Sequence, residues 1–198
     1  MKPGIFGGSF NPIHNGHIHL AESVRDSLKL DRVILLPPRI SPHRDSSEYV
    51  SGADRLEMCR LATEDIKGLE VSDFELKRNE VSYTINTVRH FREKFPDDEL
   101  FLLIGSDMLL TFDEWREFEE IMKNVTLAVV SRQNGDMSEL TEKAESLSKY
   151  GRINITDVPP ITVSSTLIRK NLKNNIDCSC YLNIKVVQYI RLKKLYLS

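Results

Sequence analysis

The residues with the clearest potential for chemistry lie near the N-terminus, in the stretch FGGSFNPIHNGH at positions 6–17. His14 and His17 stand three positions apart, where a glycine-rich turn leads into an amphipathic pattern. Side chains at this spacing share one helical turn, and the first N–H groups of a helix attract anions. Gly7 and Gly8 let the backbone approach a ligand closely. The pattern favours a phosphate site, in which two imidazole donors would stabilise charge developing on a phosphoryl group.

Two other roles for the histidine pair remain open at this point. A pair of histidines in a loop can bind zinc, with His43 as a third ligand, although no cysteine or carboxylate stands nearby at a ligand spacing. Alternatively, one histidine of the pair could simply cap a helix or pack in the core. The spacing of His14 and His17 alone does not decide between phosphate, zinc and packing.

An alternation of β-rich and amphipathic segments must position these residues. The β-rich runs lie at 2–7, 32–37, 69–76, 100–107, 125–132 and 153–159, and the amphipathic stretches at 16–30, 52–66, 83–95, 112–123 and 138–151. Such alternation predicts an α/β fold with a doubly wound, mostly parallel sheet. We expect one domain over residues 1–198, with a βα core at 1–163 and a small helical part at 164–198.

The overall composition is that of an ordinary soluble globular protein, with 40% hydrophobic and 28% charged residues. The formal net charge of −2 argues against a nucleic-acid partner, which would require a basic face. No apolar run has the length of a membrane span, and the N-terminus lacks the apolar core of a signal peptide. The three cysteines have no paired spacing. We therefore expect free thiols and a cytoplasmic location.

In a doubly wound sheet, ligands bind beyond the carboxyl ends of the strands. The segments that follow the expected strands are rich in Gly, Ser, His, Arg and Asp, and they should converge on one edge of the sheet. These segments are GGSFNPIHNGH, PPRISPHR, KRNEVSYT, GSDM, SRQNG and TVSSTLIR.

Two of these segments resemble the signatures of a known superfamily. GGSFNPIHNGH resembles the H-x-G-H signature of nucleotidyltransferases, and TVSSTLIR at 162–169 resembles their second signature, I-S-S-T-x-I-R. PPRISPHR, VSYTINTVRHF and LLIGSDMLLTFDEW are similar to segments of bacterial nicotinate-mononucleotide adenylyltransferases, and the resemblance runs from about Lys2 to Tyr196. It implies a Rossmann-like fold and transfer of AMP from ATP to nicotinate mononucleotide. The products would be deamido-NAD, in NAD biosynthesis, and pyrophosphate.

The resemblance assigns roles to individual residues of this chain. The catalytic residues would be His14 and His17 on the α-phosphate, and Arg44 and Arg169 on the leaving pyrophosphate. The residues expected to bind ATP are Gly7, Gly8, Ser9, Phe10, Gly105, Asp107, Arg132, Ser164, Ser165 and Thr166. The residues expected to bind nicotinate mononucleotide are His43, Ser82, Tyr83, Thr84 and Trp115. Mg²⁺ would arrive with ATP and keep mainly phosphate and water ligands, so no protein cage is expected.

The residue types agree with these roles. Ser82–Thr84 lies where a helix should begin, and free N–H groups there can hold the carboxylate of nicotinate. Trp115 could stack on a pyridine ring, Asp107 could accept from ribose hydroxyls, and the loop carrying His43 and Arg44 could close as a lid. Plainer roles remain open: helix caps for Ser82–Thr84 and Asp107, and a half-buried aromatic for Trp115.

Some positions depart from the commonest pattern of the family. Ser9 and Asn11 stand where Thr and Asp are usual, Arg44 replaces Lys, Asn86 replaces Asp, and Leu182-Asn183 replaces Val-Pro. None of these departures affects His14, His17, Trp115 or the segment 165–169. Two other functions stay open: another adenylyl- or cytidylyltransferase, such as the pantetheine-phosphate enzyme, and a non-catalytic nucleotide-binding regulator. The sequence also leaves open whether the chain forms a homo-oligomer.

Overall fold

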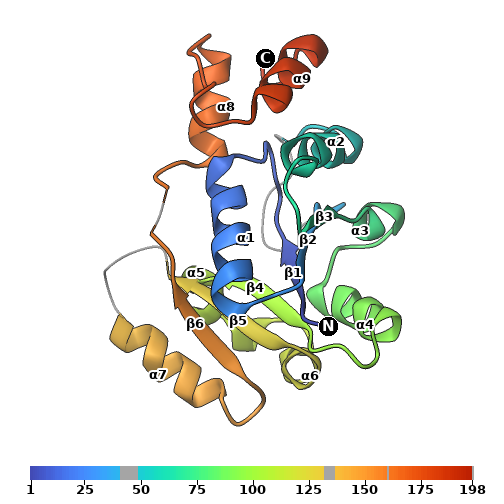
Figure 1. Ribbon diagram of the computed structural model, residues 1–198, viewed down its shortest axis with the longest axis vertical. Coiled ribbons are helices and arrows are strands. Elements are labelled where there is room, and N and C mark those ends of the chain that lie inside the picture. The colour runs from blue at the N-terminus through green and yellow to red at the C-terminus, as the bar shows by residue number, and fades with distance from the viewer. Residues whose placement is uncertain (41–48, 132–136, 160, 198) are drawn as a thin grey trace.

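A parallel β-sheet forms the centre of the molecule (Figure 1). The computed structural model describes the chain except for residues 41–48, 132–136, 160 and 198. Its strands are β1 (Pro3–Gly7), β2 (Arg32–Leu36), β3 (Leu69–Val71), β4 (Phe101–Gly105), β5 (Thr126–Ser131) and β6 (Ile153–Asp157). They pair in the order β3-β2-β1-β4-β5-β6, and every pair is parallel. The predicted doubly wound sheet is confirmed, and its strand order reverses between β1 and β4.

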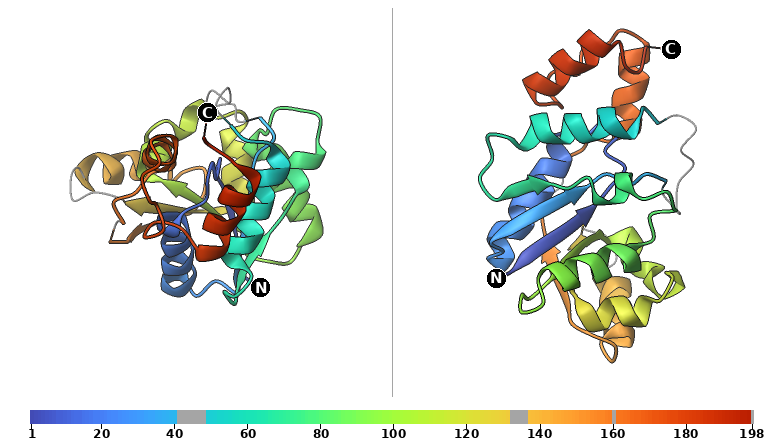
Figure 2. Two further views of the ribbon diagram at one scale, coloured as in Figure 1. Left: turned by 90° about the horizontal axis from the view of Figure 1, so that it is seen from above. Right: turned by 90° about the vertical axis from the view of Figure 1, so that its right-hand side faces the viewer.

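Helices cover both faces of the sheet (Figure 2). One face is covered by α1 (Asn15–Leu28) and α2 (Gly52–Thr63). Beyond the end of the sheet, α8 (Ser165–Lys173) and α9 (Ile184–Lys193) extend the same buried cluster, and α9 packs on α2 (Figure 1). The other face is covered by α4 (Thr84–Lys94), α5 (Ser106–Leu110), α6 (Phe118–Asn124) and α7 (Met137–Leu147). Two short helices, α3 (Phe74–Lys77) and the 3-10 helix η1 (Phe112–Glu114), complete the described elements.

Alternating strand residues supply the two hydrophobic cores. In β1, Ile5 packs with the helices of one face and Phe6 with those of the other. Leu102 and Leu103 of β4 divide in the same way. Because both faces are buried, these strands read as continuous apolar runs without polar alternation.

The C-terminal helices share a core with the N-terminal elements. Ile168 of α8 and Val186 of α9 belong to the same buried cluster as Phe6 of β1 and Val24 of α1. The main-chain N–H of Asn15 donates to the carbonyl of Tyr181 at 2.8 Å. These contacts hold α8 close to the loop that joins β1 to α1.

Two predicted elements differ from the structure. The strand expected at 69–76 ends at Val71, and the following FELK forms α3. The helix expected at 112–123 is interrupted, because Trp115 is extended and Glu117 adopts a left-handed conformation with φ of 56°. The interruption lets Phe112 stay buried while the Trp115 ring packs against it, with 4.9 Å between centroids.

Candidate active site

Two cavities open near the carboxyl ends of the strands, and the loop between β1 and α1 borders both. The larger has a volume of about 340 Å³ and is lined mainly by α1, α8 and the segment before α8. The smaller has a volume of about 140 Å³ and is lined by β1, β4, α4 and α5. Ser9 and His17 line both cavities, so the two spaces meet at these residues.

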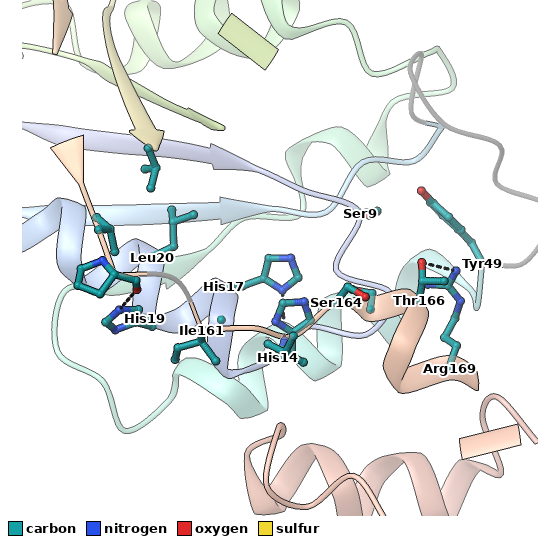
Figure 3. A pocket seen from close by; sticks show the side chains of 16 residues that line it. Ser9, His14, His17, His19, Leu20, Tyr49, Ile161, Ser164, Thr166 and Arg169 are labelled. Carbon is teal, nitrogen blue, oxygen red and sulfur yellow. Dashed lines mark hydrogen bonds between the residues drawn. The ribbon is translucent and has the colours of Figure 1, made fainter. Parts of the chain in front are cut away.

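The larger cavity has an apolar end and a polar end (Figure 3). Leu20 and Ile161 line it on the side where His19 lies, while Thr166 and Arg169 lie on the opposite side. The Nε2 atom of His19 donates to the carbonyl of Pro159 at 3.0 Å. The two histidines of the signature lie between these ends. A nucleotide with a flat apolar base and an anionic tail matches this polarity.

The histidine pair is held in a fixed geometry. His14 is the N-cap of α1 and its side chain is buried. The rings of His14 and His17 stack with 3.7 Å between their centroids. The main-chain N–H of His14 donates to Nδ1 of His17 at 3.3 Å. Neutral His17 therefore carries its proton on Nε2, and this N–H is the donor that the ring can offer to a ligand.

Phe10 packs against the histidine pair from the core. Its ring lies in the core, and Phe10, which is expected to bind ATP, is not among the described residues that line either cavity. The ring packs edge-on against His17, with 5.1 Å between centroids. A Cβ on Gly8 would lie 2.8 Å from Cζ of Phe10. Glycine is thus required at position 8 because the Phe10 ring lies against the backbone.

The start of α8 is fixed to the same loop. Ser164 caps α8, since its Oγ accepts from the N–H of Leu167 at 3.1 Å. The hydroxyl of Ser165 donates to the carbonyl of Pro12 at 2.9 Å. Nη1 of Arg169 donates to the carbonyl of Asn11 at 3.0 Å. The two signature segments, from opposite ends of the chain, therefore form one site.

The smaller cavity combines residues from both expected binding sets. Its lining includes Ser82, Thr84 and Trp115, expected to bind the mononucleotide, and Gly7, Gly8, Gly105 and Asp107, expected to bind ATP. Tyr83 is the N-cap of α4, and its ring lies 4.9 Å from the guanidinium carbon of Arg116. Tyr83 is not among the described residues that line the smaller cavity.

Ser82 is tied to its neighbours and does not cap α4. Its Oγ accepts from the N–H of Arg39 at 3.1 Å, and its hydroxyl donates to the carboxyl group of Glu75. Within the described residues, the Tyr83 side chain makes no capping hydrogen bond to α4. The positive end of α4 thus lies beside the smaller cavity, where Thr84 lines it.

Glu75 is a site residue that the sequence did not reveal. It lines the smaller cavity, although its side chain is buried. The hydroxyl of Thr87 donates to Oε1 of Glu75 at 2.6 Å. Burial raises the pKa of the Glu75 carboxyl group, against the opposing effect of hydrogen bonds from Thr87 and Ser82. The strand predicted over 69–76 ends at Val71, so the sequence pattern gives no indication that Glu75, in α3, lines the cavity.

Arg55 is a second residue of this kind. It is only 2% exposed, and its guanidinium donates to the carbonyls of Ser9 at 3.0 Å and Pro38 at 2.6 Å. It therefore clamps the β1–α1 loop to the end of β2. A signal was available, because Arg55 shares a helical face with Met58, Cys59 and Ala62, a stripe that is otherwise apolar.

Three of the expected site residues lie outside the part of the chain that the structure describes. His43, Arg44 and Arg132 lie outside the described residues, as does the expected lid. The part of the chain that the structure describes contains no group of three or more His, Cys, Asp or Glu side chains placed to hold a metal ion. None of its helices is long and apolar enough to span a membrane.

Comparison with known proteins gives a consistent family. A model of the family described as cytidylyltransferase-like matches residues 5–171. A protein of Clostridium novyi (strain NT), named "Probable nicotinate-nucleotide adenylyltransferase", is 36% identical over 180 residues, which cover 90% of each chain. A protein of the same name from Shewanella sp. (strain MR-4) is 35% identical over 214 residues and covers 100% of each chain.

A solved structure shares the fold. The nicotinic acid mononucleotide adenylyltransferase of Plasmodium falciparum, complexed with NaAD, matches with a TM-score of 0.78 at 19% identity. The match covers 98% of this chain and 97% of that chain. The arrangement of strands and helices is therefore that of a nucleotidyltransferase. The two relatives named above are more than 30% identical to this chain over most or all of its length, which identifies the family within that group. The chain belongs to the nicotinate-nucleotide adenylyltransferase family, within the cytidylyltransferase-like group.

Proposed function

We propose that this chain transfers AMP from ATP to nicotinate mononucleotide, which forms deamido-NAD and releases pyrophosphate. One observation carries the proposal: two cavities of different character meet at Ser9 and His17. A transfer between two nucleotides needs separate sites whose reacting phosphates come together at one point. The names of the curated relatives support the choice of acceptor.

ATP would occupy the larger cavity. Its adenine would lie toward Leu20 and Ile161, and its β- and γ-phosphates toward Arg169, which is well suited to bind phosphate by its fork of donors. His14 and His17 would then flank the α-phosphate. Ser9, Ser164, Ser165 and Thr166 line the same cavity and would complete this site.

Nicotinate mononucleotide would occupy the smaller cavity. Trp115 offers a face on which a pyridine ring can stack, and the N-terminus of α4 at Thr84 attracts its carboxylate. Ser82 and Tyr83 fix the backbone of this helix start. Asp107 and the glycines that line the cavity would approach the ribose and the phosphate.

The reaction would proceed by in-line displacement. A phosphate oxygen of the mononucleotide forms a bond to the α-phosphorus of ATP, while the bond from that phosphorus to the bridging oxygen breaks and pyrophosphate leaves. The attacking group is an anion at neutral pH, so no general base is required. Catalysis consists of positioning and of stabilising negative charge by the Nε2–H of His17, by His14 and by Arg169. Arg44 and Arg132, outside the described residues, would add charge.

Mg²⁺ would enter with ATP and neutralise charge on the phosphates. Such an ion would be held mainly by phosphate oxygens and water. We further propose that the chain forms a single domain and that the protein is located in the cytoplasm. The free thiols of Cys59, Cys178 and Cys180 support this location.

An acceptor panel tests this function. The purified chain is incubated with Mg²⁺ and ATP labelled at the α-phosphate, together with nicotinate mononucleotide or 4′-phosphopantetheine. We expect labelled deamido-NAD and stoichiometric pyrophosphate from the first acceptor only. Adenylylation of phosphopantetheine in its place would assign the chain to a different reaction. Pyrophosphate release at background with both acceptors would favour a non-catalytic regulator.

A further inference from the structure

Asn11 connects the phosphate-binding loop to three other segments. It is 1% exposed, and its Oδ1 accepts from the N–H of Val50 at 3.2 Å and from the hydroxyl of Tyr196 at 2.8 Å. Its main-chain oxygen accepts from Nη1 of Arg169 at 3.0 Å. A carbonyl oxygen has two lone pairs, so the two donors to Oδ1 use its full accepting capacity. The position of Asn11 is therefore set from several sides, and Arg169 is bonded to its backbone.

Tyr196 reaches this residue from the far end of the chain. It lies in the tail beyond α9, which ends at Lys193. Lys194 and Tyr196 both adopt left-handed conformations, with φ of 53° and 63°. Such conformations are unfavourable for residues other than glycine and persist where surrounding contacts impose them. The tail is thus folded back so that the Tyr196 hydroxyl meets Asn11, and Leu195 and Tyr196 pack against the core cluster shared by α1 and α9.

We propose that Tyr196 is a positioning residue for the triphosphate site. Its hydroxyl orients the side chain of Asn11, and the backbone of Asn11 in turn holds the guanidinium of Arg169. Tyr196 would act on the β- and γ-phosphates through this connection, without contact to the substrate. The proposal rests on the proposed function, which assigns those phosphates to Arg169.

A tail that only stabilised the fold would behave differently. Loss of packing lowers stability and affects all ligands alike, whereas loss of the Asn11 hydrogen bond should affect the ligand that depends on Arg169. ATP and AMP share the base, the ribose and one phosphate, and they differ in the phosphates assigned to Arg169. The ratio of their affinities therefore separates positioning from packing.

The test compares Tyr196→Phe with Tyr189→Phe in the full-length chain. Both variants lose one hydroxyl from the same region, and the Tyr189 hydroxyl donates to Asp54 at 2.9 Å, whereas that of Tyr196 donates to Asn11. Calorimetry gives the dissociation constants of ATP and AMP. We expect Tyr196→Phe to weaken ATP binding about 5-fold, consistent with loss of one hydrogen bond, and to change AMP binding less than 2-fold. Tyr189→Phe should change neither. Equal changes for ATP and AMP in Tyr196→Phe, or none, would overturn the proposal.

A double variant tests the route through Arg169. If Tyr196 acts on ATP by way of Arg169, adding Tyr196→Phe to Arg169→Met should cause no further loss of ATP affinity. Independent, multiplying losses would contradict this route. In steady-state kinetics, we expect Tyr196→Phe to lower kcat and to leave KM for nicotinate mononucleotide unchanged. Failure of the chain to use that acceptor would refute the proposed function but leave the comparison of ATP with AMP intact.

Discussion

The proposed mechanism assigns its central role to His17. It lines both cavities, its ring stacks on His14, and a main-chain N–H fixes its tautomer. A donor held in this way needs no reorganisation when charge develops on a phosphate between the cavities. The ring of Phe10 packs edge-on against that of His17.

Replacement of His17 by alanine should therefore reduce turnover far more than stability. We expect kcat to fall by about 10²–10³-fold, the usual cost of losing one preorganised donor. His90→Gln is the matched control, because His90 stacks on Phe74 at 3.8 Å and is not among the described residues lining the cavities. Steady-state kinetics at saturating ATP measure the effect. Near-normal turnover in His17→Ala would remove His17 from the mechanism.

The buried carboxyl group of Glu75 predicts a pH dependence of stability. Burial raises the pKa of Glu75 above its ordinary value of 4.5, so folding favours the neutral form. Its contribution to stability is fully present below that value and is lost as pH rises through the higher folded pKa. Glu75→Gln mimics the neutral form. Urea unfolding should show the wild type losing stability relative to the variant from pH 4 to pH 7, and a difference that stays constant or changes in the opposite direction would contradict this.

Among the helices, α1, α4 and α8 all begin at the cavities, but their first turns are satisfied differently. His14 is the N-cap of α1, and Ser164 caps α8 with its side chain. Tyr83, at the start of α4, has an aromatic side chain that cannot supply this hydrogen bond as Ser or Asp would. In the proposed function, the N-terminus of α4 is left to bind the carboxylate of nicotinate.

A cap introduced at position 83 should separate substrate binding from stability. Tyr83→Asp places a carboxylate at the N-terminus of α4, which would satisfy its N–H groups and repel the carboxylate of nicotinate. We expect KM for nicotinate mononucleotide to rise at least 10-fold, with little change in KM for ATP. Tyr83→Ser, which adds a neutral cap, should show a smaller rise. Equal kinetics in Tyr83→Asp and the wild type would place the carboxylate elsewhere.

The elements were largely predictable, and the contacts between them were not. Apolar runs such as 32–37 predicted strands because both faces of the sheet are buried. His14, His17 and Arg169 stood out by motif, and the structure brings them to one site. The contacts of Arg55 and Tyr196 were not predictable, because their partners Ser9 and Asn11 lie 46 and 185 positions away in the sequence.

In the whole molecule, the site depends on both ends of the chain. The larger cavity is lined both by Ser9, near the N-terminus, and by Arg169, near the C-terminus. The hydroxyl of Tyr196 donates to Asn11, in the loop between β1 and α1. The C-terminal helices contribute to the core that also contains Phe6 and Val24. Such an arrangement favours one cooperative unit over a core with a separable appendage.

Unfolding should accordingly occur in a single transition. We expect calorimetry to give one peak with equal calorimetric and van't Hoff enthalpies, and near-ultraviolet and far-ultraviolet circular dichroism to lose their signals together. ATP at about 100 times its dissociation constant should stabilise the entire chain by about 2.7 kcal/mol. An early transition confined to residues 164–198 would show that these helices form a separate unit.

The measurement that tests the central claim most directly compares two acceptors. With ATP and Mg²⁺ saturating, kcat/KM is measured for nicotinate mononucleotide and for nicotinamide mononucleotide, which differ only in an acid and an amide group. One charge-assisted interaction at α4 is worth about 1.5–3 kcal/mol, so we expect the acid to be favoured by about 10- to 150-fold. A ratio near one, or a preference for the amide, would contradict the account.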